Sequence, residues 1–346
     1  MYKDIGVIGI GACGSNIAFE FEELGYNTLI VNTSMEDLKS VKAQYKYHIK
    51  KGEGAAKNRN TAKEVFMADI KNTMTTIIGH ITEDFVMVCF GTGGGTGSGI
   101  AGTISQILSE HGKKVIMVGV IPNEAEESIV SCNNSYLCVS EIEDLDVGCV
   151  FLLDNSTRKN KFAINKEFAK LFDDFVRMEH ASKEGNLDVT EKKTLLSTKG
   201  YAVLNRISKE KTSTEHIMNS IKSGCNASLE NDQTIMYYGF SMCRSGINLT
   251  ELEKEIGIPL DGFKGYGAMS NILLMVGLSY PFTRMKKIKS KVSSNMQRIT
   301  ENMNARQTKM FDKEDLLGDL LSSKQPKQNK NDGFNIDLLR SLGSSK

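Results

Sequence analysis

A nine-residue segment, Gly91-Thr-Gly-Gly-Gly-Thr-Gly-Ser-Gly99, constrains the fold of this 346-residue chain more than any other feature. Six of its nine residues are glycine, so neither a regular helix nor a strand is expected there. The segment follows an apolar run, Phe85–Phe90, and precedes a helical pattern, Ile100–Leu108. A loop in this position leaves backbone amides and a helix N-terminus bare for an anion, so the pattern predicts a phosphate-binding loop.

No lysine follows these glycines, which distinguishes the segment from a Walker loop. Phosphate charge is therefore expected to be neutralised by backbone amides, the helix dipole and Mg²⁺. The hydroxyls of Thr92, Thr96 and Ser98 add donors that suit phosphate oxygens. A flexible linker is the alternative interpretation, but linkers do not usually emerge from so apolar a strand.

A second glycine motif, Gly9-Ile-Gly-Ala-Cys-Gly14, follows the first apolar run of the chain. Its GxGxxG spacing is typical of dinucleotide binding, which makes an NAD-dependent oxidoreductase an alternative function. That fingerprint also needs an acidic residue at the end of the second strand, where this chain has Asn32. No catalytic histidine motif is apparent either, so NAD binding is disfavoured.

Five apolar runs alternate with helical patterns over residues 1–155, and this alternation predicts a Rossmann-like α/β domain with a parallel sheet covered on both faces. The runs are Ile5–Ile10, Thr28–Val31, Phe85–Phe90, Val115–Ile121 and Val147–Leu153.

The remainder of the chain predicts a long helix followed by a second, smaller α/β domain. Phenylalanine and leucine recur at helical spacing over residues 164–183, and Gly185 is a natural helix stop. Strand candidates follow at Gln233–Ser241 and Asn271–Ser279. A final helix pattern extends from Thr283 to Leu321 and leads into a polar stretch that predicts a flexible tail.

The composition fits an ordinary globular chain of the cytoplasm. Hydrophobic residues make up 40% of the sequence, charged residues 25%, and the net charge is +1. The longest apolar stretch, Val115–Ile121, is far shorter than the ~20 residues of a membrane span, so no direct membrane contact is expected. The seven cysteines are scattered without a CxxC pair, so neither a disulfide framework nor a zinc site is predicted.

The glycine motifs also carry a family resemblance. The sequence GTGGGTGSG looks like the signature of the tubulin and FtsZ family of GTPases, and Gly11-Ala-Cys-Gly-Ser-Asn16 resembles the first phosphate loop of that family. The resemblance covers about residues 1–300. Within the family, the short length, the basic C-terminal helix and the tail look most like the TubZ group of plasmid and phage segregation tubulins. The resemblance implies that the chain binds GTP and GDP together with Mg²⁺.

The resemblance implies five parts: a GTP-binding domain over residues 1–163, a central helix over 164–184, an activation and C-terminal α/β domain over 185–282, a C-terminal helix over 283–321 and a flexible tail over 322–346. It also assigns residues to the nucleotide. These are Gly11, Ala12, Cys13, Asn16, Gly54, Ala55, Ala56, Gly91, Gly93, Gly94, Gly95, Thr96, Gly97, Ser98, Glu126, Asn155, Phe162 and Asn165.

Several of these assignments have alternatives. Residues 51–60 resemble the γ-phosphate loop, but alone they would be an exposed basic turn. In the ribose loop that begins at Pro122, Glu126 or Glu124 would accept from the sugar, although the arginine that FtsZ supplies next is absent. Asn155 and Asn165, assigned to the guanine base, could instead be a turn residue and a helix cap, respectively. Phe162 would stack on the base.

A third segment resembles the loop after the family's central helix. Asn186, Asp188 and Glu191 match its NxDxxD pattern, with Glu in the last position, and the resemblance implies that they act on the nucleotide of the next subunit. The alternative is a capping box, because Asp188 and Glu191 have the spacing that starts a helix. A capping carboxylate can also be catalytic.

The predicted function is thus a polymerising GTPase that forms dynamic filaments, with plasmid or phage DNA segregation as its expected role. A structural filament that binds nucleotide with negligible turnover is the alternative. The basic run Arg284–Lys291 is expected to be a solvated helix face, so direct DNA binding is not expected. Apolar residues over Phe334–Leu342 predict a short helix that folds against a partner, such as a DNA-binding adaptor.

Overall fold

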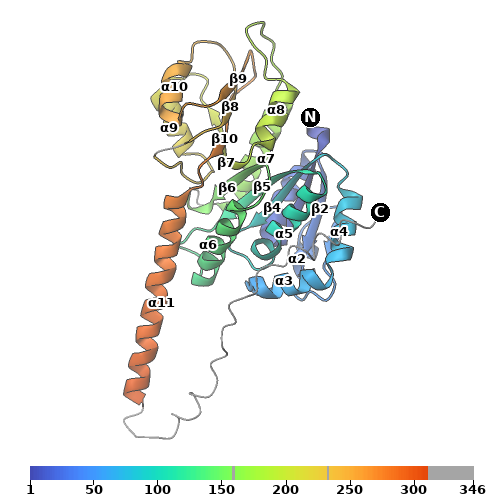
Figure 1. The fold of residues 1–346 in the computed structure, drawn as a ribbon, viewed down its shortest axis with the longest axis vertical. Helices are drawn as coiled ribbons and strands as arrows, with labels where there is room; N and C mark the ends of the chain where they lie inside the picture. The colour runs from blue at the N-terminus through green and yellow to red at the C-terminus, as the bar shows by residue number, and fades with distance from the viewer. Residues whose placement is uncertain (158–159, 232–233, 311–346) are drawn as a thin grey trace. The chain divides into compact units, whose positions relative to one another are not determined.

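The computed structural model describes residues 1–157, 160–231 and 234–310, and their fold is drawn in Figure 1. The described strands join one sheet in the order β3-β2-β1-β4-β5-β6-β7-β10-β8-β9. The strands are β1 (Ile5–Ile10), β2 (Asn27–Asn32), β3 (Lys46–His48), β4 (Phe85–Gly91), β5 (Lys114–Ile121), β6 (Cys149–Asp154), β7 (Gly200–Ile207), β8 (Tyr237–Met242), β9 (Asp261–Tyr266) and β10 (Asn271–Leu278).

Helices connect most of these strands. They are η1 (Tyr2–Asp4), α1 (Gly11–Glu23), α2 (Met35–Ser40), α3 (Arg59–Ala68), α4 (Ile70–His80), α5 (Thr96–Glu110), α6 (Ile129–Glu143), η2 (Asn155–Thr157), α7 (Lys161–Arg177), α8 (Val189–Ser197), α9 (Thr214–Lys222), α10 (Leu249–Ile256) and α11 (Phe282–Met310). Residues 1–289 form one compact unit. The described part of the second unit, from Ser290, is the remainder of α11.

The strands from β1 to β6 are parallel to their neighbours, which confirms the predicted Rossmann-like sheet. Every residue of β1 and β6 is buried, as expected when helices cover both faces. On one face, Phe21 of α1 and Phe172 of α7 pack edge to face with ring centroids 5.8 Å apart. This aromatic packing joins α1 to α7 on that face of the sheet.

Helix α7 corresponds to the predicted helix over 164–183, but its bounds differ. It begins at Lys161 because the Asn160 side chain caps it by accepting from the backbone N–H of Phe162. It ends at Arg177, well before Gly185. The Lys192 ammonium donates to the carbonyl oxygens of Val176 and Met178, so it satisfies groups that a longer helix would have paired internally.

The region after Gly185 is α/β, as predicted, and its strands extend the same sheet. β7 pairs in parallel with β6, and β10 lies antiparallel between β7 and β8. The strand predicted at Gln233–Ser241 is β8, which begins only at Tyr237; Gln233 lies outside the described residues. The strand predicted at Asn271–Ser279 is β10, which ends one residue earlier.

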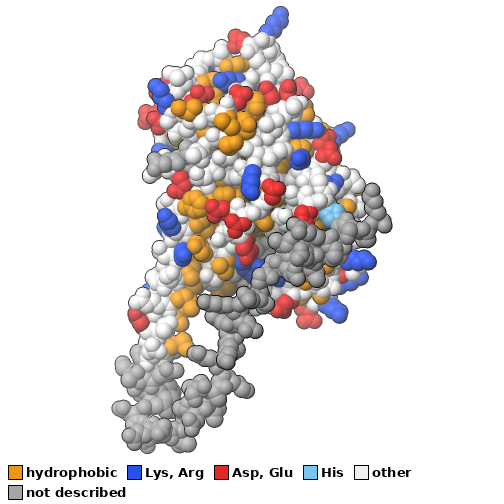
Figure 2. All heavy atoms as spheres, viewed as in Figure 1, with side chains coloured by type: hydrophobic (Ala, Val, Ile, Leu, Met, Phe, Trp, Pro, Cys, Tyr) orange, Lys and Arg blue, Asp and Glu red, His pale blue; other side chains and the backbone are white. Residues whose placement is uncertain are grey.

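The predicted C-terminal helix corresponds to α11, which starts at Phe282 and is described as far as Met310. The predicted end at Leu321, the flexible tail and the candidate helix over Phe334–Leu342 lie outside the described residues. Among the described helices, none is long and apolar enough to cross a membrane. Figure 2 shows acidic and basic side chains interspersed on the visible face.

Candidate functional site

A pocket of about 580 Å³ opens where β1, β2, β4, β5 and β6 end. Its lining comes from the segments that follow these strands. The strand order reverses between β1 and β4, and ligands of open parallel sheets bind outside the carboxyl ends at such a switch point. The volume is in the range of nucleotide-sized ligands. All but two of the residues predicted to bind nucleotide line this pocket; Ser98 and Glu126 are the exceptions.

β1 passes directly into α1, with no residue between Ile10 and Gly11. Gly11 has a positive φ of 68° and begins the helix, and Ala12, Cys13 and Asn16 line the pocket beside it. A Cβ on Gly14 would lie 2.1 Å from the carbonyl oxygen of Cys89. Only glycine permits this approach of α1 to β4, which brings the first-turn amides to the mouth of the pocket.

The glycine-rich segment differs from the expectation that none of it is helical. Thr96–Gly99 form the first turn of α5, because glycines there allow the helix to pack closely. A Cβ on Gly99 would lie 2.9 Å from the carbonyl oxygen of Arg59. The N-cap Gly95 has no side chain to satisfy the first amides of α5, so these donors suit an anion.

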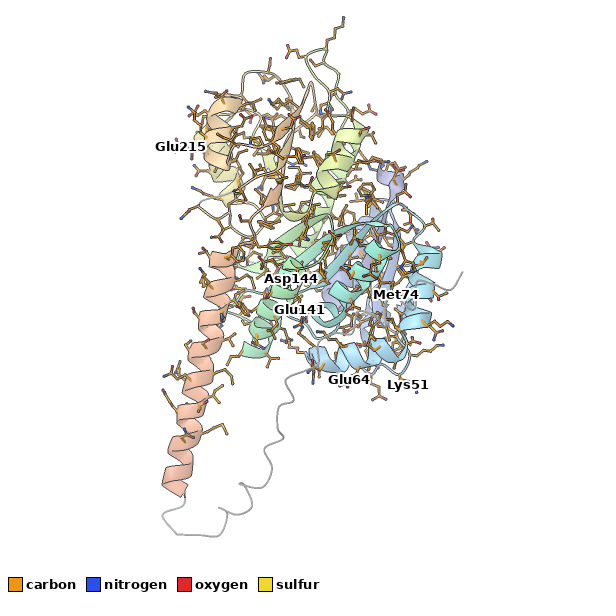
Figure 3. All side chains as sticks on the ribbon, viewed as in Figure 1. Lys51, Glu64, Met74, Glu141, Asp144 and Glu215 are labelled. Carbon is orange, nitrogen blue, oxygen red and sulfur yellow. The ribbon has the colours of Figure 1, made fainter. Side chains whose placement is uncertain are left out.

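Ser98 faces away from the pocket. It is buried, and its hydroxyl donates to the carbonyl oxygen of Gly94. The carbonyl oxygen of Ser98 itself accepts from the guanidinium of Arg59, with an Nη2 to O distance of 2.9 Å. Arg59 also pairs with Glu141 of α6. Figure 3 labels Glu141 on α6, Glu64 on α3 and Lys51 in the loop before α3.

The loop before α3 carries backbone strain. Lys51, Ala56 and Lys57 have positive φ values of 64°, 45° and 61°, a region that L-residues rarely adopt. Gly54, Ala55 and Ala56 line the pocket, as does Lys57, which the sequence did not single out as a ligand. Such strain persists only where the surrounding structure maintains it, and it is concentrated at ligand sites.

Three asparagines and one aromatic residue are among the side chains that line the pocket. Asn155, Phe162 and Asn165 line it together with Asn16. Asn165 is 6% exposed and lies inside α7, so it is not the cap of that helix; Asn160 is. The side-chain Oδ1 of Asn155 is buried and accepts no hydrogen bond within the described residues. An unpaired buried acceptor at a pocket wall is suited to a ligand that donates hydrogen bonds.

The loop after β5 brings a different glutamate to the pocket from the two expected. Glu126 is exposed and lies outside the lining. Glu124 is buried and pairs with Arg284 and Lys287 of α11, each at 2.7 Å. Burial alone raises the pKa of Glu124, but hydrogen bonding from Lys287 and the charge of Arg284 lower it to about 2. Glu127 does line the pocket and pairs with Lys57 at 3.2 Å.

Arg284 corrects one expectation about α11. The basic run was expected to be a solvated helix face, but Arg284 is 8% exposed and bonds to Asp154 as well as Glu124. Lys286, Lys287 and Lys289 of the same run are exposed. The run is therefore solvated on one face only, because α11 packs its other face against the body through Met285 and Ile288.

Two carboxylates that line the pocket, Asp37 and Glu127, were not predicted as ligands. Within the described residues, no three His, Cys, Asp or Glu side chains cluster as a protein-only metal site would require. Mg²⁺ is usually held by one or two carboxylates together with substrate phosphates, so the donor set fits that ion. Glu127 forms an ion pair with Lys57, whereas Asp37 accepts a hydrogen bond from the neutral Asn32 amide at 3.2 Å, so Asp37 is the more available.

Asn186, Asp188 and Glu191 are not brought to the pocket. Asp188 is the N-cap of α8 and accepts from the backbone N–H of Glu191 at 2.8 Å, while Glu191 accepts from the N–H of Asp188 at 2.8 Å. The capping box is thus present. Thr190 and Lys193 of α8 lie beside Asp84 and Phe85, at the amino end of β4. The seven residues of β4 span about 20 Å, so Asp188 and Glu191 lie at the opposite end of the parallel strands from the pocket.

Comparisons with known proteins show which family this chain resembles. Residues 4–161 match the family model "Tubulin/FtsZ family, GTPase domain". The chain is 30% identical to the "Tubulin-like protein TubZ" of Clostridium botulinum C phage over 301 residues, which cover 84% of this chain and 80% of that relative.

Solved structures with a similar fold include relatives of the same kind. A tail-truncated TubZ of Clostridium botulinum phage c-st superposes with a TM-score of 0.78 at 29% identity, covering 86% of this chain and 99% of that structure. A GTPγS-form protofilament of TubZ from Bacillus thuringiensis serovar israelensis has a TM-score of 0.73 at 17% identity, covering 87% of this chain and 94% of that one.

Proposed function

This chain belongs to the tubulin/FtsZ family of GTPases, and from that premise we propose that it polymerises into dynamic filaments that hydrolyse GTP between adjacent subunits. The observation that carries the proposal is the separation of the pocket from Asp188 and Glu191 by the length of the parallel strands. A gap of about 20 Å is too long for any side chain to bridge within one subunit. Stacking subunits end to end would close it.

In the proposed complex, the glycine-rich loops hold the phosphates through their amides. Asp37, which lines the pocket, would hold Mg²⁺, and the ion would supply positive charge that stabilises phosphoryl transfer. Asn16, Asn155 and Asn165 read the base, and Phe162 stacks on it. Glu127, and not Glu124 or Glu126, accepts hydrogen bonds from the ribose hydroxyls, because it alone of the three lines the pocket.

The catalytic part of the proposal concerns Asp188 and Glu191 of the adjoining subunit, with Asn186 beside them. These carboxylates would orient the water that attacks the terminal phosphate. Asn186 and Asp188 are exposed and Glu191 is half-buried on a free subunit, which supports this, since a neighbour can reach them. An incomplete site in each subunit makes turnover depend on assembly.

The test is phosphate release measured against protein concentration, with electron microscopy of the same samples. We expect filaments with GTP, and a specific turnover that rises steeply above a critical concentration. Turnover independent of concentration would contradict hydrolysis between subunits. Filaments with negligible phosphate release would favour the structural filament instead.

We further propose that the filament serves segregation of plasmid or phage DNA through an adaptor bound by residues after Leu321. The TubZ relatives support this only by their likeness, and the residues concerned lie outside the described structure. A chain truncated after Leu321 is expected to bind GTP normally but to lose adaptor binding or filament assembly. Co-sedimentation with and without the adaptor separates these outcomes, and unchanged behaviour in both would contradict the assignment.

A further inference from the structure

Asn134 of α6 lies behind both phosphate loops. Its side chain is 6% exposed, and its amide Nδ2 lies 2.7 Å from the carbonyl oxygen of Lys57 and 3.3 and 3.2 Å from those of Gly93 and Gly94. Carbonyl oxygens only accept hydrogen bonds, so the amide must present its NH₂ group to all three. One planar group therefore joins two loops from distant parts of the sequence.

The contact with the glycine-rich loop helps to fix where its amides point, together with the hydroxyls of Ser131 and Ser98, which donate to the carbonyls of Gly93 and Gly94, respectively. In a trans peptide the carbonyl of one residue and the N–H of the next point in opposite directions. When the carbonyls of Gly93 and Gly94 face Asn134, the N–H groups of Gly94 and Gly95 must face the other way. Asn134 does not line the pocket, whereas all three glycines of this run do, so the loop lies between Asn134 and the pocket.

The contact with Lys57 acts on the strained loop. Lys57 and the preceding Ala56 both have positive φ, which costs free energy in residues other than glycine. The 2.7 Å hydrogen bond from Asn134 to the Lys57 carbonyl stabilises this conformation directly. The same loop packs on the glycine-rich one, since a Cβ on Gly95 would lie 2.8 Å from the Cβ of Ala55.

We infer that Asn134 is a positioning residue that holds the two phosphate loops in register, and so determines the preference of the pocket for a nucleoside triphosphate over a diphosphate. The inference rests on the proposed function, because it assumes that a guanine nucleotide occupies this pocket. A diphosphate lacks the terminal phosphate that needs both loops at once. Loss of register therefore weakens triphosphate binding more than diphosphate binding.

The test compares Asn134→Asp with a matched control, Asn133→Asp, by titration calorimetry with GTPγS and with GDP. Asn134→Asp keeps the shape of the side chain but places acceptors against three carbonyls. Asn133 is the exposed neighbour on the same helix, so its variant adds the same charge without touching the loops. We expect GTPγS affinity of Asn134→Asp to fall about 10- to 100-fold, GDP affinity to fall less, and the control to match the wild type.

Asn134→Ser, which retains a donor in a smaller side chain, is the second variant in case Asn134→Asp does not fold. Hydrogen exchange should then rise in peptides covering residues 51–60 and 91–99 and stay unchanged in the middle of α5. An unchanged ratio of GTPγS to GDP affinity, or exchange raised throughout the chain, would overturn the inference. Failure of the wild type to bind either nucleotide would instead overturn the proposed function.

Discussion

The guanidinium Nε of Arg284 lies 2.5 Å from Oδ2 of Asp154, which ties the first turn of α11 to the end of β6. Both side chains are buried, at 8% and 2% exposure. The next residue, Asn155, lines the pocket, and Glu124 on the neighbouring loop shares the same guanidinium. One cation therefore bonds to two carboxylates beside two loops of the nucleotide pocket, and Lys287 supplies a second positive charge to Glu124.

Replacing Arg284 with alanine is expected to lower the free energy of unfolding by about 3 to 5 kcal/mol, because it leaves Asp154 buried without its cation and Glu124 with Lys287 alone. Urea denaturation measures this. Lys286→Ala is the control, since that lysine is exposed on the same turn and its removal should change stability by less than about 0.5 kcal/mol. Equal effects of the two substitutions would contradict the role of the buried pair.

Glu124 should make stability depend on pH in the acid range. Its pKa is about 2 in the folded chain against an ordinary value of 4.5, so its carboxylate stabilises the fold fully above pH 4.5 and progressively less as the pH falls toward 2. The stability difference between wild type and Glu124→Gln is therefore expected to shrink over that range. Urea midpoints at pH 7, 4 and 3 measure it, with exposed Glu126→Gln as the control. A difference that does not vary with pH would count against this pairing.

Two substitutions at Asp188 separate its capping role from its proposed catalytic one. Serine is also a good N-cap, so Asp188→Ser should keep the melting temperature near that of the wild type, while Asp188→Ala should lose about 1 kcal/mol. Both variants lack the carboxylate and should bind GTP normally, lose most turnover and form persistent filaments. Wild-type phosphate release by Asp188→Ser would show that the carboxylate only starts the helix.

The asparagines of the pocket should select guanine over adenine. Amides can accept from the N1 and N2 hydrogens of guanine and donate to O6, whereas adenine presents the opposite pattern and would leave buried amides unpaired, a penalty of up to ~10⁴-fold. Asn165→Ala is expected to weaken GTP binding and reduce this selectivity. Asn160→Ala, on the same helix but at its cap, should lower stability without changing selectivity. If ATP displaced labelled GTP at concentrations similar to those of unlabelled GTP, recognition of guanine by these asparagines would be refuted.

Much of the parallel sheet could be predicted, because strands buried on both faces are continuous apolar runs. β1 matches its predicted bounds, while β3 and β9 were missed. β3 is only three residues long, and β9 has one fully buried residue among six, so neither has an apolar run to detect. β7 was also missed, although its run from Tyr201 to Leu204 is buried.

The parts of the site formed by glycine-rich backbone could be predicted from the sequence. The positions of its charged side chains could be predicted less well. The glycine loops were located from composition, but the sequence could not show that the turn after Pro122 would point Glu127, not Glu126, to the pocket. The burial of Arg284 could have been predicted, because Arg284 precedes Met285 and lies one turn before Ile288, both of which are buried. Helical spacing from those apolar residues places Arg284 on the inner side of α11.

The reciprocal hydrogen bonds of Asp188 and Glu191 have a consequence for how filaments start. Because the start of α8 is closed by bonds within a single chain, both carboxylates already have fixed positions in a free monomer. Binding of one subunit to the next then costs little conformational entropy at Asp188 and Glu191. The kinetic barrier to filament nucleation should therefore come from aligning whole subunits and not from folding a loop. Under the proposed function, a filament tip built this way would be competent for hydrolysis as soon as the next monomer binds.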